Sequence, residues 1–172
     1  MKNVGMAVLA GLVLTAGVVF TQSKSDSDVL REARDRAEIE DLMWRYARAL
    51  DTNDADAYAA AYTPDGQFSA GTNATTGRDA LRKMVADMRQ GQEAARAKGE
   101  PARPPMYHMT ANHRIQFTDK DHARLDAYYI TAMAAGGAST PLRVAAVGRS
   151  VDELVRLNGK WLIKVRNVAP QN

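Results

Sequence analysis

The dipeptide Asn158-Gly159 constrains the fold most, because it separates two runs of residues that are candidates for β-strands. Asn-Gly favours a two-residue β-hairpin turn, in which both central residues need positive φ angles. The strand candidates of this half of the chain are residues 107–117, 122–133, 142–157 and 160–168. This order predicts an antiparallel meander in the C-terminal half.

The N-terminal half has helical periodicity instead. Apolar residues recur at helical spacing from Asp28 to Leu50, and residues 77–97 carry a second apolar stripe. Residues 55–62, Ala-Asp-Ala-Tyr-Ala-Ala-Ala-Tyr, predict a short helix between them. Three helices followed by strands predict an α+β domain, with the helices packed on one side of a curved antiparallel sheet.

Two connections are also predicted. Residues 63–66, Thr-Pro-Asp-Gly, favour a turn, because proline sets one backbone dihedral angle and glycine permits the next. Residues 67–70 then predict a short strand. Residues 97–105 contain proline and glycine at several positions and predict a loop.

The first residues form a separate segment. Residues 4–20 carry no charged side chain, follow Lys2 and give way abruptly to a polar stretch. This pattern predicts a secretory signal peptide over residues 1–23, with an uncleaved membrane anchor as the alternative. Residues 24–172 are then a single domain of a secreted or periplasmic protein, which meets a membrane only if the leader stays attached.

Composition excludes several classes of function. Hydrophobic residues make up 45% of the chain and charged residues 25%, which is typical of a globular protein. The net charge of +3 is spread along the sequence and argues against nucleic-acid binding. Because the chain has no cysteine, disulfides, zinc–thiolate sites and a thiol nucleophile are excluded.

Two of the three histidines, His108 and His113, lie five positions apart in one predicted strand. Side chains alternate along a strand, so these two imidazoles should face opposite sides and cannot share a metal ion unless a β-bulge lies between them. Ile115 and Phe117 have the same parity as His113. If His108 lines a cavity while those two residues fill the core, a β-bulge between Ala111 and His113 is required.

Three segments of the sequence resemble the SnoaL-like family of the nuclear-transport-factor-2-like superfamily: residues 39–68, 107–117 and 156–168. The resemblance extends over residues 33–169. It implies a cone-shaped, barrel-like curved antiparallel sheet wrapped on three N-terminal helices, with a cavity inside and a homodimeric or homotrimeric assembly.

The pattern is most similar to that of scytalone dehydratase, bile-acid 7-dehydratase and lindane dehydrochlorinase. Those enzymes pair an aspartate at the end of the first helix with a histidine at the start of a long strand, which implies catalytic roles for Asp51 and His108. The same resemblance implies that Tyr46 is catalytic and that Asn112 and Arg166 bind substrate. Tyr46 and Asp51 are about 140° apart on an ideal helix. They can face one pocket only if the helix ends near Leu50 and the pocket caps that end.

Imidazole can hold or release a proton near neutral pH, and a neighbouring carboxylate fixes its tautomer. We therefore expect His108 to remove a proton beside a carbonyl or ring carbon, Asp51 to orient it, and Tyr46 to donate to the developing oxygen. This scheme needs no metal and no cofactor. It favours a lyase or isomerase of the dehydratase type, acting on a small apolar, aromatic, polyketide-like or steroid-like oxygenated molecule.

Other interpretations stay open. The cavity can serve a non-catalytic ligand-binding or accessory domain, or the protein can be a structural partner like the small subunit of aromatic-ring dioxygenases. Asp51 can be a capping residue, Tyr46 a core residue and Asn112 a backbone ligand at the bend. Arg166 can pair with Asp126 or stay at the surface. His113 and His122 are expected to be structural or exposed.

Overall fold

The computed structural model describes residues 25–134 and 141–170, so the signal peptide predicted for residues 1–23 lies outside the described residues. The elements follow in the order α1 (Asp26–Thr52), α2 (Ala55–Ala60), β1 (Tyr62–Ala70), β2 (Asn73–Thr76), α3 (Arg78–Ala97), β3 (Met106–Phe117), β4 (His122–Met133), β5 (Arg143–Leu157) and β6 (Lys160–Asn167). Within the same two ranges, none of the helices has the length and apolar character that crossing a membrane requires.

The predicted helices are confirmed, and polar residues end or begin them. The side chain of Ser25 accepts a hydrogen bond from the backbone N–H of Asp28 at the start of α1. The helix ends at Asn53, whose φ of 52° is left-handed. Asp54 then caps α2 by accepting from the backbone N–H of Ala57 at 3.0 Å. Because Asn53 and Asp54 hold these two positions, Asp51 is not a capping residue.

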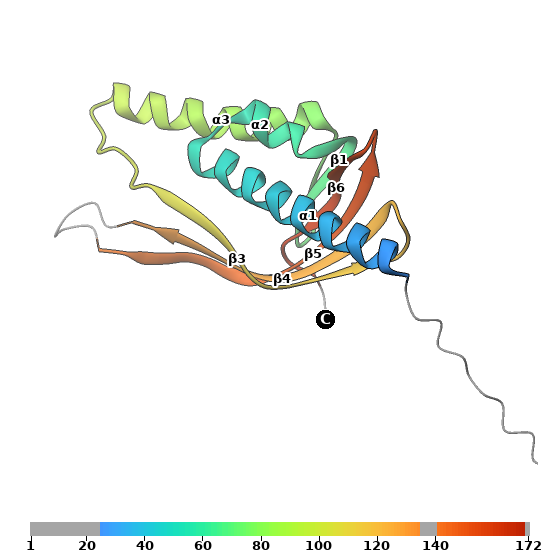
Figure 1. The fold of residues 1–172 in the computed structure, drawn as a ribbon. Helices are drawn as coiled ribbons and strands as arrows, with labels where there is room; N and C mark the ends of the chain where they lie inside the picture. Colours follow the sequence, from blue (N-terminus) through green and yellow to red (C-terminus); the bar gives the residue numbers. More distant parts are fainter. Residues whose placement is uncertain (1–24, 135–140, 171–172) are drawn as a thin grey trace, which may run out of the picture.

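The described strands form one curved, open sheet in the order β2-β1-β6-β5-β4-β3. Strands β3 to β6 make the predicted antiparallel meander. The sheet as a whole is mixed rather than purely antiparallel, because β1 pairs in parallel with β6. Figure 1 shows the helices together on one side of the sheet, so the predicted α+β class is confirmed.

The turn predicted at residues 63–66 was wrong, because these residues belong to β1. Tyr62 pairs with Ile163, and the next paired residue, Gln67, meets Val165. The four residues between them do not pair with β6 and form a bulge. Pro64 has no backbone N–H to donate, so it fits this unpaired stretch without interrupting the pairing on either side.

The two other local predictions are confirmed. Asn158 and Gly159 have φ angles of 52° and 76°, as a two-residue hairpin with two left-handed positions requires. In β3, Ala111 pairs with Tyr128 and Arg114 with Asp126, so two residues of β3 lie opposite one residue of β4. One of the two is Asn112, which has a φ of 49°. This is the β-bulge that the alternation of β3 required.

The core lies between the helices and the face of the sheet that they cover. Its largest fully buried apolar side chains come from α1, α2, α3 and the strands: Ile39, Leu42, Tyr58, Tyr62, Leu81, Val85, Leu125, Leu154 and Ile163. Burial of this apolar surface is the main force that presses α1 onto the sheet. Helix α1 therefore lies against β3, and the last turn of the helix reaches the start of that strand.

Candidate functional site

Asp51 and His108 meet where the last turn of α1 reaches the start of β3. The Asp51 Oδ1 atom lies 2.9 Å from the His108 Nδ1 atom. The same oxygen accepts the backbone N–H of His108, also at 2.9 Å. The Asp51 side chain is only 7% exposed, and that of His108 is 24% exposed. The aspartate thus holds both the strand and the imidazole ring.

This geometry assigns the tautomer of His108. An ionised carboxylate only accepts hydrogen bonds, so the shared proton belongs on Nδ1, and Nε2 carries the free lone pair. The guanidinium of Arg48 lies 3.7 Å from the second oxygen of Asp51 and forms an ion pair with it. An imidazole in this state can accept a proton at Nε2 while the carboxylate stabilises the resulting cation.

His108 lines a pocket of about 280 Å³ between α1 and the sheet. Its walls are largely apolar: Ile39, Met43, Trp44, Ala47, Met109, Ile115 and Leu125. Four polar side chains also line it: Glu40, His108, Thr110 and His113. A mostly apolar cavity with a few convergent polar groups is the usual form of a small-molecule site.

Tyr46 and Arg166 come together in a different place, a buried cluster outside the His108 pocket. The Arg166 guanidinium lies over the Tyr46 ring, 4.5 Å from its centroid. Arg166 also donates to the carboxylate of Asp152, which is fully buried. The hydroxyls of Tyr58 and Tyr62, 3.1 Å apart, belong to the same cluster. Its members are not among the residues that line the His108 pocket.

The position of Tyr46 follows from the length of α1. The helix continues through Thr52, so Tyr46 and Asp51 keep the angle of about 140° between them. The helix ends two residues after Leu50, but Tyr46 does not line the pocket of His108, so the two side chains do not share it. Burial raises the pKa of Tyr46, an effect that the nearby Arg166 opposes in part. The phenol is therefore held in its neutral form inside the protein.

Burial also governs the charged pair of this cluster. It raises the pKa of Asp152 to about 6, against the attraction of Arg166. For Arg166, burial lowers the pKa, but Tyr46 and Asp152 outweigh it and raise the pKa above its ordinary value. Arg166 is thus a buried cation, neither at the surface nor paired with Asp126. Asp126 instead accepts from Arg124 at 2.8 Å.

Asn112 is not near the dyad. It is exposed, and it lines a shallow hollow of about 440 Å³ with Arg114, Arg124 and Tyr128. In β4, residues 124, 126 and 128 alternate with buried residues, so this hollow lies on the face of the sheet turned away from the helices. The structure therefore brings together Asp51 with His108, and Tyr46 with Arg166, and separates both pairs from Asn112.

His113 is exposed, as expected, but it also lines the pocket, together with Glu40, which sequence analysis did not single out. The signal was present in the predicted bulge: a bulge that keeps Ile115 in the core also turns His113 toward the helices. Asp152 was missed as well, and the local sequence around it gives no sign of its role. Among the residues that the structure describes, no three histidine, aspartate or glutamate side chains gather as a metal site would require.

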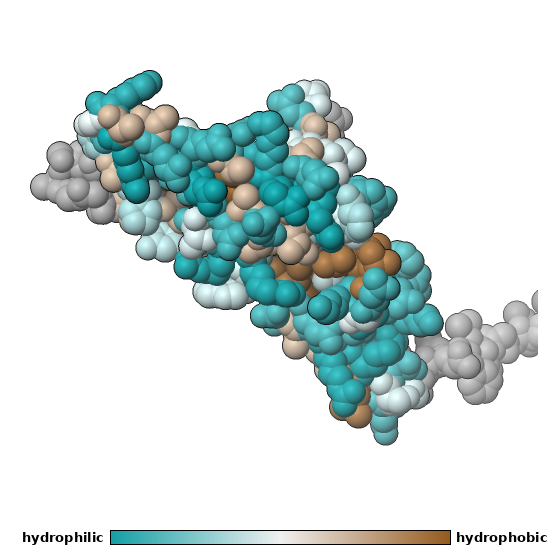
Figure 2. Space-filling view, turned by 90° about the horizontal axis from the view of Figure 1, so that it is seen from above, coloured by the Kyte–Doolittle hydropathy of each residue, from teal (hydrophilic) through white to brown (hydrophobic). Residues whose placement is uncertain are grey.

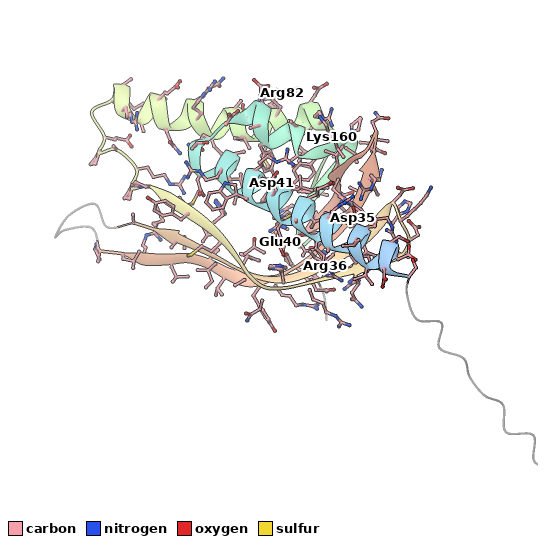
Figure 3. The ribbon with its side chains drawn as sticks, viewed as in Figure 1. Asp35, Arg36, Glu40, Asp41, Arg82 and Lys160 are labelled. Atoms are coloured by element: carbon pink, nitrogen blue, oxygen red, sulfur yellow. The ribbon has the colours of Figure 1, made fainter. Side chains whose placement is uncertain are left out.

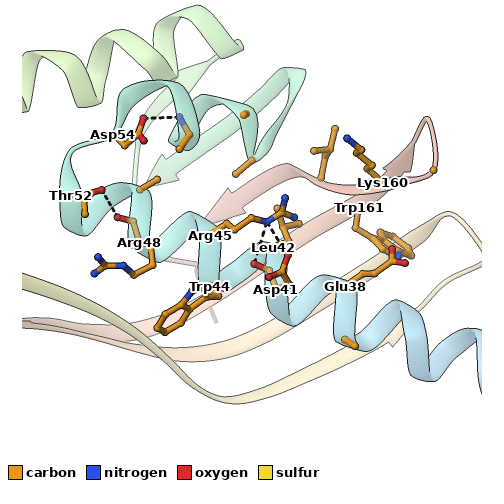
Figure 4. Close-up of a pocket in the computed structure, with 17 residues that line it drawn as sticks. Glu38, Asp41, Leu42, Trp44, Arg45, Arg48, Thr52, Asp54, Lys160 and Trp161 are labelled. Atoms are coloured by element: carbon orange, nitrogen blue, oxygen red, sulfur yellow. Dashed lines mark hydrogen bonds and ion pairs between the residues drawn. The ribbon is translucent and has the colours of Figure 1, made fainter.

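A second, larger hollow of about 1050 Å³ lies between α1, α2 and the β5–β6 hairpin (Figure 4). Figure 2 shows the helix-bearing side of the molecule as mostly hydrophilic, with a hydrophobic area in its centre. No histidine lines this hollow, and its Asp41 carboxylate is held by Arg45 at 3.1 Å. The smaller pocket is lined by His108, whose imidazole contacts Asp51, so we take it as the candidate site.

Comparison with known proteins places this geometry in context. The SnoaL-like domain family matches residues 31–167. No curated protein matches the chain in sequence. An NTF2-like protein with a cystatin-like fold from Novosphingobium aromaticivorans is 22% identical, with a TM-score of 0.67 over 85% of this chain and 88% of that chain.

Two other solved structures have the same fold. A protein from Novosphingobium aromaticivorans, provisionally assigned as a scytalone dehydratase, is 23% identical, with a TM-score of 0.64 over 81% of this chain and 85% of that chain. A protein from Catenulispora acidiphila in complex with S-DNPA is 23% identical, with a TM-score of 0.62 over 78% of this chain and 91% of that chain. Likeness at these identities shows a shared fold.

Proposed function

This chain belongs to the SnoaL-like domain family, and from that premise we propose that it is a cofactor-independent lyase or isomerase of the dehydratase type. The Asp51–His108 pair would remove a proton from a small, largely apolar, oxygenated substrate. The observation that carries the proposal is the 2.9 Å contact between the Asp51 carboxylate and His108 Nδ1 beside an apolar pocket.

The pair has the parts that general base catalysis needs. With Nδ1 bonded to Asp51, the Nε2 lone pair of His108 accepts the substrate proton. The carboxylate then stabilises the imidazolium through a bond that is already formed, so little reorganisation accompanies the transfer. The apolar side chains around His108 lower the local polarity and so strengthen this electrostatic stabilisation. Proton transfer of this kind requires neither a metal nor a cofactor.

The comparisons supply supporting context for the substrate class. A neighbour of the same fold is provisionally assigned as a scytalone dehydratase, and another was solved with a small ligand, S-DNPA. A pocket of about 280 Å³ is large enough for a small molecule. We also propose that residues 1–23 direct export to the periplasm or the outside, that residues 24–172 act as one domain, and that the domain forms a homodimer or homotrimer.

The proposal is tested with nitrobenzisoxazole, a general probe for a base in an apolar pocket. A base removes the one proton on its isoxazole carbon, the N–O bond breaks, and a coloured nitrophenolate forms. We expect His108→Ala to lower kcat/KM by about 10²-fold to 10⁴-fold. His122→Ala is the matched control, because His122 also bonds a carboxylate, Asp119 at 2.9 Å, but on an exposed turn.

His122→Ala should leave the rate unchanged, and circular dichroism should show that both variants are folded. Equal rates for the wild type and His108→Ala would overturn the proposal.

A second candidate function is a non-catalytic binding domain. It is favoured by the burial of Tyr46, which leaves the expected proton donor outside the pocket. This function predicts that a small molecule co-purifies with the protein and is recovered chemically unchanged. Mass spectrometry of the native protein, before and after prolonged incubation with that molecule, distinguishes it from turnover.

A further inference from the structure

The pocket contains a second imidazole–carboxylate pair, at the end away from Asp51. The His113 Nε2 atom lies 3.2 Å from the Glu40 Oε1 atom. Both side chains line the same pocket as His108. Figure 3 shows Glu40 on the side of α1 that is turned toward the sheet. Both side chains are partly exposed, His113 by 40% and Glu40 by 56%, so this pair lies at the mouth of the pocket.

The backbone places the two pairs on facing surfaces. Glu40 and Asp51 are eleven residues apart on α1, which is about 20° from three full turns, so they share one face of the helix. The bulge at Asn112 inserts one residue between His108 and His113 and turns both imidazoles toward that face. Without the extra residue, His113 would point to the opposite side of the sheet.

The two pairs are too far apart to act on one bond. Eleven helical residues rise about 16 Å along α1. Five residues of β3, one of them in the bulge, extend about 13–16 Å. A base and an acid for a single elimination would have to lie within a few bond lengths of each other. The second pair therefore recognises another part of the ligand.

We propose that His113, held by Glu40, binds a second oxygen of an elongated apolar ligand whose reacting end lies at His108. This inference rests on the proposed function and specifies its substrate class. The Glu40 carboxylate accepts the Nε2–H of His113, which leaves Nδ1 free to accept a hydrogen bond from a ligand hydroxyl. Between the two ends lie only apolar walls and Thr110. The fitting ligand has oxygen functions at both ends of a narrow apolar body.

Other polar groups near this end are already engaged. Arg36 donates to the backbone carbonyl of Ile115 at 3.0 Å, and its guanidinium lies over the ring of Phe117. The third histidine, His122, is bonded to Asp119 away from the pocket. His113 is thus the imidazole at the outer end that is placed to bind a ligand.

The test uses biphenyl with a hydroxyl at neither end, at one end and at both ends. Binding is followed by the fluorescence of Trp44, which lines the pocket. For the wild type, we expect the second hydroxyl to strengthen binding by about threefold to tenfold, the gain of one hydrogen bond. His113→Leu should lose this gain and bind the one-hydroxyl compound as the wild type does. His122→Leu is the matched control and should keep the gain.

Glu40→Gln should reduce the gain only in part, because the amide still accepts the Nε2–H. The inference is overturned if the second hydroxyl adds nothing in the wild type, if no biphenyl binds, or if the gain persists in His113→Leu. This assay measures binding alone, so its outcome is independent of the proposed function. The proposed function fails if the wild type and His108→Ala remove the proton at equal rates.

Discussion

Replacing Arg166 with methionine should destabilise the protein strongly at neutral pH. Arg166 is 2% exposed, donates to the fully buried Asp152 and lies 4.5 Å from the centre of the Tyr46 ring. Methionine keeps much of the volume but removes the charge. Asp152 is then left as a buried carboxylate without its partner, which typically costs about 3–5 kcal/mol of unfolding free energy. For a domain of this size, the melting temperature should fall by roughly 6–20 °C.

The loss should depend on pH, and its sign follows from Asp152. Burial raises the pKa of this carboxyl from 3.8 to about 6. Between these values, the folded protein holds a proton that the unfolded chain has released, so the group's contribution to the unfolding free energy falls as pH rises. Without Arg166, the pKa of Asp152 rises further and this fall extends to higher pH. Arg166→Met should therefore be less destabilised at about pH 5 than at about pH 8.

Urea unfolding at both pH values measures these effects. Arg124→Met is the matched control, because Arg124 also bonds an aspartate, Asp126 at 2.8 Å, but its side chain is 51% exposed. It should change the unfolding free energy by at most about 1 kcal/mol. A loss below about 1 kcal/mol in Arg166→Met, or an equal loss at the two pH values, would refute the reasoning about the buried pair.

Three further substitutions test other parts of the structure. Gly66→Ala should destabilise the protein by about 1–3 kcal/mol in urea unfolding, because the new Cβ atom would lie 2.9 Å from the Tyr62 Cβ atom. Asn112→Val should cost about 1–2 kcal/mol, because a β-branched residue resists the φ of 49° at the bulge. Asp51→Asn should slow nitrobenzisoxazole opening by at least about tenfold, because an amide can hold the opposite tautomer of His108.

Each of these substitutions has a control within the chain. Gly91→Ala, in the middle of α3 with open space around it, should stabilise the protein by about 0.5–1 kcal/mol. Asn112→Gly should keep the fold, and it should also keep the stronger binding that the second hydroxyl of biphenyl provides. The reason is that glycine adopts the left-handed angle freely. Asp119→Asn, beside His122, should leave the ring opening unchanged. An unchanged rate in Asp51→Asn would contradict the orienting role of the carboxylate.

Local patterns in the sequence were enough to predict much of the fold. Asn158-Gly159 defined the hairpin, since few other pairs of residues adopt two positive φ angles. The conflict of parity between His108 and the core residues Ile115 and Phe117 located the bulge in β3. Both inferences succeeded because they depend on residues that are close together in the sequence.

Features that depend on non-local pairing could not be predicted. Counting from the hairpin would place Arg166 opposite Val151, but a shift of one residue between Glu153 and Leu154 moves it opposite Asp152. That shift creates the buried ion pair, and no local pattern in the sequence predicts the shift. The parallel pairing of β1 with β6 likewise joins segments far apart in the chain.

The pairing of Asp51 with His108 was expected from the resemblance to the SnoaL-like family and not from local patterns in the sequence. Asp51 and His108 meet because a helix end and a strand start coincide. Tyr46 does not join them, because the helix runs two residues beyond Leu50 and keeps the two side chains on different faces. The predicted bulge also implied that His113 faces the helices, because His113 has the same parity as Ile115.

The central claim is that Asp51 holds the proton of His108 on Nδ1 and leaves Nε2 free as the base. A nitrogen NMR spectrum of the histidine-labelled protein measures this tautomer directly. The geometry predicts that neutral His108 carries its proton on Nδ1 in the wild type and loses this preference in Asp51→Asn. A proton found on Nε2 in the wild type, or the same tautomer in both proteins, would contradict the account.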